Sequence, residues 1–329
     1  MSAQGKSDSG GEDQYVPYSQ RAEWSDVTPV LQDDGPGGVV DIDYSKEFVD
    51  AMNYFRGVMA VNEKSERALQ LTEDVIGHNA ANYTAWYYRR LCLHQVSKDA
   101  GNLDAWANEF GFIESILCYS PKNYQIWFHR QQVVEVTQDA SRELAAIEEV
   151  LAGDAKNYHA WTHRQWVLRT FKLWKDELEF VKRLLDQDVR NNSAWNHRWF
   201  VIRHTAGADA LATDDALLQR EVDFTFEAIK KVPRNESAWA YLKGLLATRP
   251  ADSPAVTSVQ DRVKALRGSG EGDADSNVPL LAFLAHLATK RSEVEDAQAI
   301  CEELALHADP LRGAFWRQYS ARAEETAAR

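Results

Sequence analysis

Apolar residues recur at intervals of three and four along most of the chain, and this spacing predicts amphipathic helices. Two clear examples run from Arg142 to Leu151 and from Glu177 to Leu185. Their apolar positions are Leu144, Ile147, Val150 and Leu151 in the first, and Leu178, Val181, Leu184 and Leu185 in the second. The alternating pattern of a half-buried strand is absent. The sequence therefore predicts an all-α fold.

A longer pattern, Asn-Tyr-x-x-Trp-x-x-Arg, repeats with a period of roughly 34 to 44 residues. Its copies begin at Asn82, Asn123, Asn157, Asn191 and Asn235, and their tryptophans are Trp86, Trp127, Trp161, Trp195 and Trp239. Positions i, i+4 and i+7 share one helix face, so we expect Asn, Trp and Arg to point inward together, with the Asn capping a new helix. Because one short unit cannot bury its Trp whereas stacked hairpins can, the repeat predicts an α-solenoid of helix hairpins.

The chain divides into an arm and a repeat region. Residues 1–45 are predicted to form an extended N-terminal arm, disordered over residues 1–14, and residues 46–329 the solenoid. We expect motifs near residues 82–90, 123–131, 157–165, 191–199 and 235–243, with a degenerate capping motif near 309–317 that contains Trp316. Two polar stretches, Thr205 to Asp215 and Thr248 to Asn277, are predicted surface loops.

Composition narrows the class of protein. The chain has 329 residues, 44% of them hydrophobic, and a formal net charge of −13, which argues against nucleic-acid binding. No apolar run reaches the roughly 18 residues that a membrane span needs, and the N-terminus lacks the apolar core of a signal peptide. Cys92, Cys118 and Cys301 form no Cys-x-x-Cys pair. These features predict reduced thiols and a cytoplasmic location without a membrane span.

A cation precedes the asparagine in four copies, at Lys122, Lys156, Arg190 and Arg234. A positive charge there is locally unfavourable, because the start of a helix already carries partial positive charge. In a solenoid these starts lie along one rim, where the cations and the hydroxyls of Tyr124 and Tyr158 would converge on an anion such as phosphate. The alternative is that the cations pair with nearby acidic residues, Asp154, Asp186 or Asp188, and only solvate the rim.

Two interpretations are open for the histidines, a metal site and a packing role. His159 and His163 are four residues apart, a spacing that can bind metal. His163, however, occupies the position of His129 and His197 in neighbouring copies, and a repeated position usually indicates packing. The sequence contains no zinc-ligand motif and no Ser-His-Asp arrangement. We therefore expect no metal site formed by this chain.

Taken together, these motifs resemble the repeats of the protein prenyltransferase α-subunit family. The resemblance rests on Pro121-Lys-Asn-Tyr-Gln-Ile-Trp-Phe-His-Arg130, Asp154-Ala-Lys-Asn-Tyr-His-Ala-Trp-Thr-His-Arg-Gln-Trp166 and Asp188-Val-Arg-Asn-Asn-Ser-Ala-Trp195. It covers about Tyr18 to Trp316. It is nearest to the branch that serves farnesyltransferase and type I geranylgeranyltransferase.

The resemblance implies a crescent-shaped, right-handed superhelix of hairpins that wraps a separately encoded β subunit. That partner would bind the zinc ion and form most of the substrate pocket, and magnesium would assist departure of the diphosphate. The reaction would attach a farnesyl or geranylgeranyl group, from its diphosphate, to the Cys of a C-terminal CaaX sequence. The enzyme would be active only as the heterodimer.

The resemblance also assigns roles to residues. It makes Lys122 the expected catalytic residue, because a positioned ammonium stabilises the charge that grows on the departing diphosphate. The other residues expected at the diphosphate or isoprenoid are Tyr124, Asn157, Tyr158 and His159. The resemblance places Gln125 at the terminal carboxylate of the peptide substrate and Tyr83 near the peptide.

Two alternatives and several departures accompany this interpretation. The alternatives are the α subunit of Rab geranylgeranyltransferase and a non-catalytic TPR-like scaffold. Asn192 and Glu236 replace the motif tyrosine in the last two copies, so we expect no second anion site there. The Gly-rich segment 267–276 has no counterpart in the family pattern. The sequence leaves open the isoprenoid length and whether one or two kinds of β subunit are served.

Overall fold

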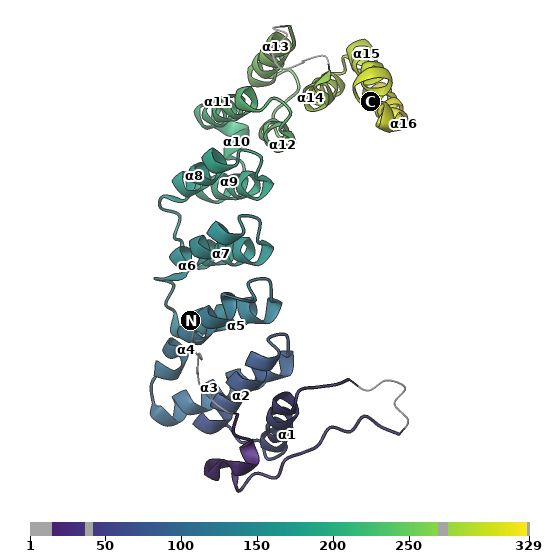
Figure 1. Cartoon of the computed structure of the whole chain (residues 1–329). Helices are drawn as coiled ribbons and strands as arrows, with labels where there is room; N and C mark the ends of the chain where they lie inside the picture. Colours follow the sequence, from purple (N-terminus) through teal and green to yellow (C-terminus); the bar gives the residue numbers. More distant parts are fainter. Residues whose placement is uncertain (1–14, 37–41, 269–275, 328–329) are drawn as a thin grey trace, which may run out of the picture. The chain divides into compact units, whose positions relative to one another are not determined.

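The structure, a computed structural model, describes residues 15–36, 42–268 and 276–327, with side chains as far as Ala321 (Figure 1). Every regular element in these ranges is helical. The chain forms two compact units, which are described separately. The first comprises Met1–Leu151 and Asn157–Val167, and the second Ala152–Lys156 and Leu168–Arg329.

The first unit contains helix hairpins preceded by two short 3-10 helices. The elements are η1 (Tyr18–Gln20), η2 (Ala22–Trp24), α1 (Lys46–Ala60), α2 (Glu66–His78), α3 (Tyr83–Ala100), α4 (Asp104–Leu117), α5 (Tyr124–Thr137), most of α6 (Glu143–Gly153) and the start of α7 (Tyr158–Phe171).

The second unit continues the pattern. Its elements after the end of α7 are α8 (Glu177–Gln187), α9 (Asn192–Thr205), α10 (Ala210–Thr213), α11 (Asp215–Lys231), α12 (Glu236–Leu245), α13 (Pro254–Gly268), α14 (Val278–Lys290), α15 (Val294–Glu303), the π-helical turn η4 (Leu304–Ala308), η5 (Pro310–Arg312) and α16 (Gly313–Ala327). The prediction of an all-α solenoid of hairpins is confirmed.

Each motif asparagine begins a helix, as predicted. The Asn82 Oδ1 accepts a hydrogen bond from the backbone N–H of Ala85, and Asn157 does the same for Ala160. The remaining motif residues that cap in this way are Asn123, Asn191 and Asn235. Such a cap satisfies a backbone donor that the first turn of a helix leaves unpaired, and contributes about 1 kcal/mol.

The same asparagine joins one repeat to the next. The Nδ2 of Asn123 donates to the Ala80 carbonyl at 2.7 Å, and the indole N–H of Trp86 donates to that same carbonyl at 2.8 Å. The Val189 carbonyl likewise receives the amide of Asn235 and the indole of Trp195. Before four of the motifs, one backbone oxygen in the loop therefore accepts from the Trp of its own repeat and from the Asn of the following repeat.

A buried glutamate on the second helix of a repeat satisfies the motif arginine. Glu109 forms a bidentate ion pair with Arg89 and also contacts His129 Nε2 at 2.9 Å, one repeat further on. All three side chains are buried. The predicted packing role of the repeated His position is thus accounted for, because the ring pairs with this carboxylate inside the stack. Glu143 with Arg130 and His163, and Glu221 with Arg198 and Tyr241, form equivalent groups.

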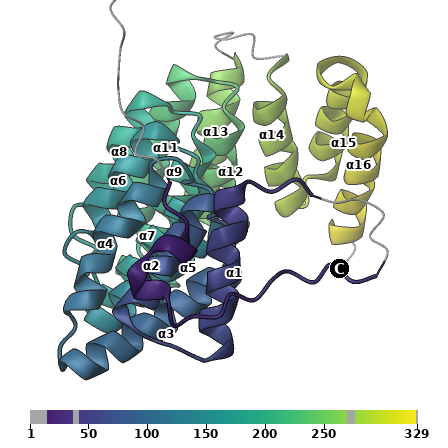
Figure 2. The ribbon, with the colours of Figure 1, turned by 60° about the horizontal axis from the view of Figure 1, so that its bottom comes forward.

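The described part of the N-terminal arm packs on the first hairpin (Figure 2). Tyr18 and Trp24 are 1% and 4% exposed, and the backbone N–H of Tyr18 donates to Asp50 of α1 at 2.8 Å. Arg67 of α2 pairs with Asp26 of the arm at 2.7 Å. The arm therefore covers apolar surface on α1 and α2 that no earlier repeat covers. The predicted disorder of residues 1–14 lies outside the described residues.

The two predicted surface loops both contain helix. The prediction is wrong for Thr248 to Asn277, because α13 occupies half of this stretch and buries Val256, Val259 and Val263 at helical spacing. The segment Arg249-Pro-Ala-Asp-Ser-Pro254 contains two prolines, which are typical of a loop. Pro254 is nevertheless the first residue of α13, a position where proline is favourable. The other stretch, Thr205 to Asp215, holds the short helix α10.

The end of the repeat region uses variants of the motif. Asn277 caps α14 and donates to the Pro233 carbonyl at 3.0 Å, although Val-Pro rather than Tyr follows it in the sequence. Trp316 of α16 is buried, and its indole donates to the Asp309 side chain at 2.7 Å instead of to a backbone carbonyl. Residues 269–275 of the Gly-rich segment lie outside the described residues.

Asn191→Ala tests the junction between repeats. The substitution removes both the cap on α9 and the 3.1 Å bond to the Ala155 carbonyl, so we expect a loss of about 2 kcal/mol in the free energy of unfolding, measured by urea denaturation. Asn192→Ala is the matched control, since that neighbouring side chain is exposed. Equal destabilisation by the two variants would contradict the junction.

The buried His–Glu pairs predict stability that depends on pH. Burial lowers the pKa of His129 and of His163 below the ordinary 6.5, despite the opposing effect of their glutamates. Burial raises the pKa of Glu109 and of Glu143, but hydrogen bonds from the histidines and the charged arginines outweigh it and leave both below the ordinary 4.5.

The unfolded chain therefore binds more protons than the folded chain around pH 6.5, where its histidines titrate, and around pH 4.5, where its glutamates titrate. We expect stability to be complete above about pH 6.5 and to fall as the pH drops through 6 towards 4. Thermal unfolding between pH 7.5 and pH 4.5 measures this, and His129→Gln should flatten the upper part of the curve. A melting temperature that rises or stays constant on acidification would refute it.

Candidate functional site

The tyrosines that follow the capping asparagines line one edge of the first unit. Tyr83, Tyr124 and Tyr158 are the first residues of α3, α5 and α7, and are 70%, 69% and 67% exposed. The preceding asparagine turns its amide inward to cap the helix, so the next side chain points away from the core. The asparagine-to-carbonyl bonds place these helix starts one above the next, which brings the tyrosines to the same rim.

His159 links two of these tyrosines. Its ring contacts Tyr124 edge-to-face, with 4.2 Å between centroids and an interplanar angle of 88°, and also contacts Tyr158 with 5.6 Å between centroids. The ring is hydrogen-bonded to the backbone of Lys122. The structure therefore gathers Lys122, Tyr124, Tyr158 and His159, all singled out from the sequence, in one group that we call the rim cluster.

Partial burial lowers the pKa of His159 below 6.5, and the hydrogen bond to Lys122 opposes this shift only in part. His159 is therefore neutral near pH 7. A neutral ring donates from one nitrogen only, and the ring is hydrogen-bonded to the backbone of Lys122. In this state His159 positions the rim cluster and adds no charge to it.

The cations before the motif asparagines lie on the surface. Lys122, Lys156 and Arg190 are exposed. The nearby carboxylates Asp154 and Asp188 accept hydrogen bonds from the backbone N–H groups of Lys156 and Arg190, at 3.0 and 2.9 Å. These bonds close the turns that precede α7 and α9, so both aspartates shape the loop before the helix.

The remaining predicted residues differ in burial. Asn157 is 2% exposed; its Oδ1 accepts from Ala160 N–H and its Nδ2 donates to the Pro121 carbonyl. It therefore fixes the start of α7 from within the core and is not itself exposed at the rim. Gln125 is the second residue of α5 and is half-buried; its backbone N–H donates to the Asn123 cap. Tyr83 lies at the start of α3, one repeat before the rim cluster.

Within residues 15–36, 42–268 and 276–327, no group of three or more His, Cys, Asp or Glu side chains is arranged to hold a metal ion. His163 is committed to Glu143 at 2.6 Å, so it does not join His159 in a metal site. In the same ranges, no helix has the length and hydrophobicity that crossing a membrane requires.

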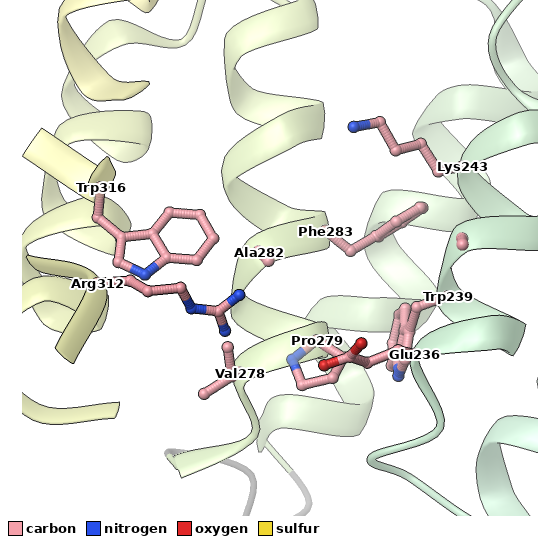
Figure 3. Close-up of a pocket in the computed structure, with 10 residues that line it drawn as sticks. Glu236, Trp239, Lys243, Val278, Pro279, Ala282, Phe283, Arg312 and Trp316 are labelled. Carbon is pink, nitrogen blue, oxygen red and sulfur yellow. The ribbon is translucent and has the colours of Figure 1, made fainter. Parts of the chain in front are cut away.

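The second unit has a different surface at its helix starts. A cavity of about 220 Å³ opens between α12, α14 and α16 (Figure 3). Glu236, in the position of the motif tyrosine, lines it together with Lys243 and Arg312. Glu236 thus places a carboxylate where the rim cluster has tyrosine hydroxyls, beside two cations. The expectation of no second anion site stays a prediction.

Sequence reasoning missed the buried glutamates that hold the motif arginines and histidines. Their signal was present, because Glu109, Glu143 and Glu177 each precede a motif histidine by 20 residues. That regularity is weaker than the Asn-Tyr-x-x-Trp pattern, since glutamate is also common on exposed helix faces.

The sequence pattern of the protein prenyltransferase alpha subunit repeat matches this chain five times. The matched residues are 65–96, 106–136, 140–171, 174–205 and 218–249. Each match covers the second helix of one hairpin and the first helix of the next, from α2–α3 to α11–α12.

Similar proteins agree with the repeat match. The chain is 42% identical over 313 residues to the protein farnesyltransferase/geranylgeranyltransferase type-1 subunit alpha of Dictyostelium discoideum, covering 94% of this chain and 95% of that protein. The subunit of the same name from Pisum sativum is 56% identical over 88 residues, which is 27% of this chain and 26% of the relative.

A solved structure, Candida albicans protein geranylgeranyltransferase-I complexed with GGPP, contains a chain that is similar over 95% of this chain and 100% of its own length. The TM-score is 0.78 and the sequence identity 30%. Repeats, relatives and fold agree. The chain belongs to the protein prenyltransferase α-subunit family, among the relatives named farnesyltransferase/geranylgeranyltransferase type-1 subunit alpha.

Proposed function

We propose that this chain is the α subunit of a heterodimeric CaaX protein prenyltransferase, with the rim cluster at the diphosphate of the isoprenoid substrate. The substrate would be farnesyl or geranylgeranyl diphosphate, and the acceptor the Cys of a C-terminal CaaX sequence. The observation that carries the proposal is the grouping of Lys122, Tyr124, Tyr158 and His159 on stacked helix starts in a chain of this family.

The rim cluster has the donors that a diphosphate needs. Lys122 brings a positive charge, and the exposed hydroxyls of Tyr124 and Tyr158 are hydrogen-bond donors that can turn towards an oxygen. The starts of α5 and α7 add the partial positive charge of a helix N-terminus. A cation at a helix start is electrostatically unfavourable by itself, and an anion bound there would offset this.

The same groups would stabilise the transition state more than the bound substrate. Negative charge accumulates on the diphosphate as its bond to the isoprenoid carbon breaks, so a fixed ammonium stabilises the transition state more than the ground state. In the proposal Lys122 supplies this effect, and His159 positions Lys122 through its backbone. Gln125 and Tyr83 would contact the peptide, and Asn157 would hold the start of α7.

In this proposal the zinc ion is bound by the β subunit, as the resemblance to the family implies. Zinc there would favour the thiolate form of the acceptor Cys, which is its nucleophilic form. Magnesium would neutralise part of the diphosphate charge as it leaves. Both metals lie outside the roles proposed for residues of this chain.

A partner is also favoured by the exposed aromatic surface near the rim. Tyr83, Tyr87, Tyr124, Phe128 and Tyr158 belong to the first unit and are 48–70% exposed. Aromatic side chains are enriched at the centres of protein interfaces, and their presence in water is otherwise unfavourable. The β subunit is the proposed occupant of this surface.

Prenyl transfer to a CaaX peptide tests the proposed function directly. We expect activity from the chain co-expressed with a farnesyltransferase or type I geranylgeranyltransferase β subunit in the presence of zinc, and none from either chain alone. Removing zinc with a chelator should abolish transfer while the two chains still co-purify. Transfer to a Rab–escort complex but not to a CaaX peptide would overturn the proposal.

Lys122→Ala tests the catalytic role. We expect kcat to fall by about 100-fold, because one electrostatic contact to the transition state is lost. Binding of the β subunit, followed by co-purification and by the melting temperature of the heterodimer, should not change. Lys156→Ala is the control, since it removes the equivalent exposed cation of the next repeat, for which no role is proposed. A normal kcat for Lys122→Ala in an intact heterodimer would discard the role.

A further inference from the structure

Arg90 of α3 is a half-buried cation without a carboxylate partner. Its Nη1 atom is enclosed and has no hydrogen-bond partner, and among the described residues neither Nε nor Nη2 has one either. Of these three nitrogens only Nη1 is fully enclosed, so the other two keep access to solvent. A guanidinium has five N–H donors and stays charged at neutral pH, so this side chain has unused donors at the surface.

The arginine one position earlier shows the usual arrangement. Arg89 is 3% exposed and forms a bidentate ion pair with Glu109. Arg130 of the next repeat, whose Nη1 is also enclosed without a partner, has Glu143 on its other nitrogens. Burying a charge without a counterion is unfavourable. Arg90 therefore differs from these two arginines, because the described part of the chain provides no counterion for it.

The repeat does not require a cation at this position. Arg90 follows the motif arginine, and the corresponding residues of the next three copies are Gln131, Gln165 and Trp199. The last copy has Lys243, which is exposed and therefore hydrated. A half-buried charge is thus not part of the packing that the copies share.

Arg90 lies within the exposed aromatic surface of the first unit. Tyr83, Tyr87 and Arg90 occupy positions i, i+4 and i+7 of α3, so they share one face of that helix. The guanidinium lies over the ring of Phe128 of α5, with 5.0 Å between Cζ and the ring centroid. Tyr87 and Phe128 are 56% and 48% exposed. A ring face compensates part of the charge but supplies no lone pair to the N–H groups.

The two helices that hold Arg90 do not supply a carboxylate to it. Each of them, described over its whole length, contains one acid: Asp99 lies nine residues beyond Arg90 on α3, and Glu135 lies in the last turn of α5. Burial lowers the pKa of Arg90 below the ordinary 12.5, and the group that opposes this shift is Tyr87. The charge of Arg90 in turn helps to lower the pKa of His129. The positive charge is therefore uncompensated at this surface.

We propose that Arg90 receives the carboxylate of an Asp or Glu side chain of the β subunit when the two chains assemble. This inference rests on the proposed function, because it names the chemistry of the partner at the aromatic surface assigned to that subunit. The planar guanidinium matches a carboxylate in shape, and Tyr87 and Phe128 would exclude water from the pair. A diphosphate is not favoured here, since Arg90 is a single cation about 10 Å along α3 from Tyr83 at the rim.

The dissociation rate of the heterodimer tests the proposal. Fluorescent labels on the two chains, chased with excess unlabelled subunit, report the loss of energy transfer as the chains separate. We expect Arg90→Gln to raise the rate at least about tenfold, because the carboxylate then lacks its counterion, and Arg90→Glu to raise it further by charge repulsion. Arg142→Gln is the matched control and should leave the rate unchanged, since that arginine is exposed and also lies over a phenylalanine ring, that of Phe110.

A structure of the heterodimer provides a second, independent measurement. It should show a carboxylate of the β subunit within about 3 Å of the Arg90 guanidinium. If Arg90→Gln fails to assemble, Arg90→Lys replaces it in the dissociation experiment. That variant keeps the charge but loses the planar fork, and should raise the rate about threefold.

Prenyl transfer by the unsubstituted heterodimer, measured in parallel, separates the two proposals. Transfer combined with unchanged dissociation rates in Arg90→Gln and Arg90→Glu would overturn this inference alone, and so would a structure in which only water or the carboxylate of a CaaX peptide contacts Arg90. Two chains that neither assemble nor transfer would overturn the proposed function and this inference with it.

Discussion

The packing of each repeat on the next depends on a backbone carbonyl that the two repeats share. In the loop before a motif, a single oxygen such as that of Ala80 accepts from the indole of its own repeat and from the asparagine amide of the next. Asparagine is suited to this role because its oxygen caps a helix while its nitrogen donates elsewhere. The spacing of successive helices is fixed by that geometry, and the buried tryptophan then fills the space between them.

This junction also decides where chemistry can occur. Because the asparagine faces inward, the residue after it must face outward, and the residue before it lies in the loop at the helix start. Tyrosines and cations are therefore exposed along one rim, whereas the motif Arg and His are buried in the core. There the buried glutamates, such as Glu109, form an ion pair with the arginine and a hydrogen bond with the histidine. Burying a charged arginine is tolerable only with such a partner.

The N-terminal arm and the last described helix depart from the repeat pattern in different ways. At the N-terminal end, the arm brings Tyr18 and Trp24 onto α1 and α2, and ion pairs such as Arg67 with Asp26 fasten it. Towards the C-terminal end, Trp316 donates to the side chain of Asp309 where earlier tryptophans donate to a backbone carbonyl.

The sequence by itself determined the helical repeat, the helix starts and the inward direction of the Asn-Trp-Arg stripe, because these depend on residues within two turns of one another. It also brought together Lys122, Tyr124, Tyr158 and His159 as candidates, through the stacking that the repeat demands and through family resemblance. Their functional roles remain proposals, but their proximity follows from the repeat.

Only the tertiary structure decided which groups satisfy the buried polar atoms. The acceptor for Asn235 lies 46 residues away and the carboxylate for His129 lies 20 residues away, and local pattern carries little information about such partners. Helix α13 was missed because its apolar stripe is short and lies among Pro, Ser and Asp residues.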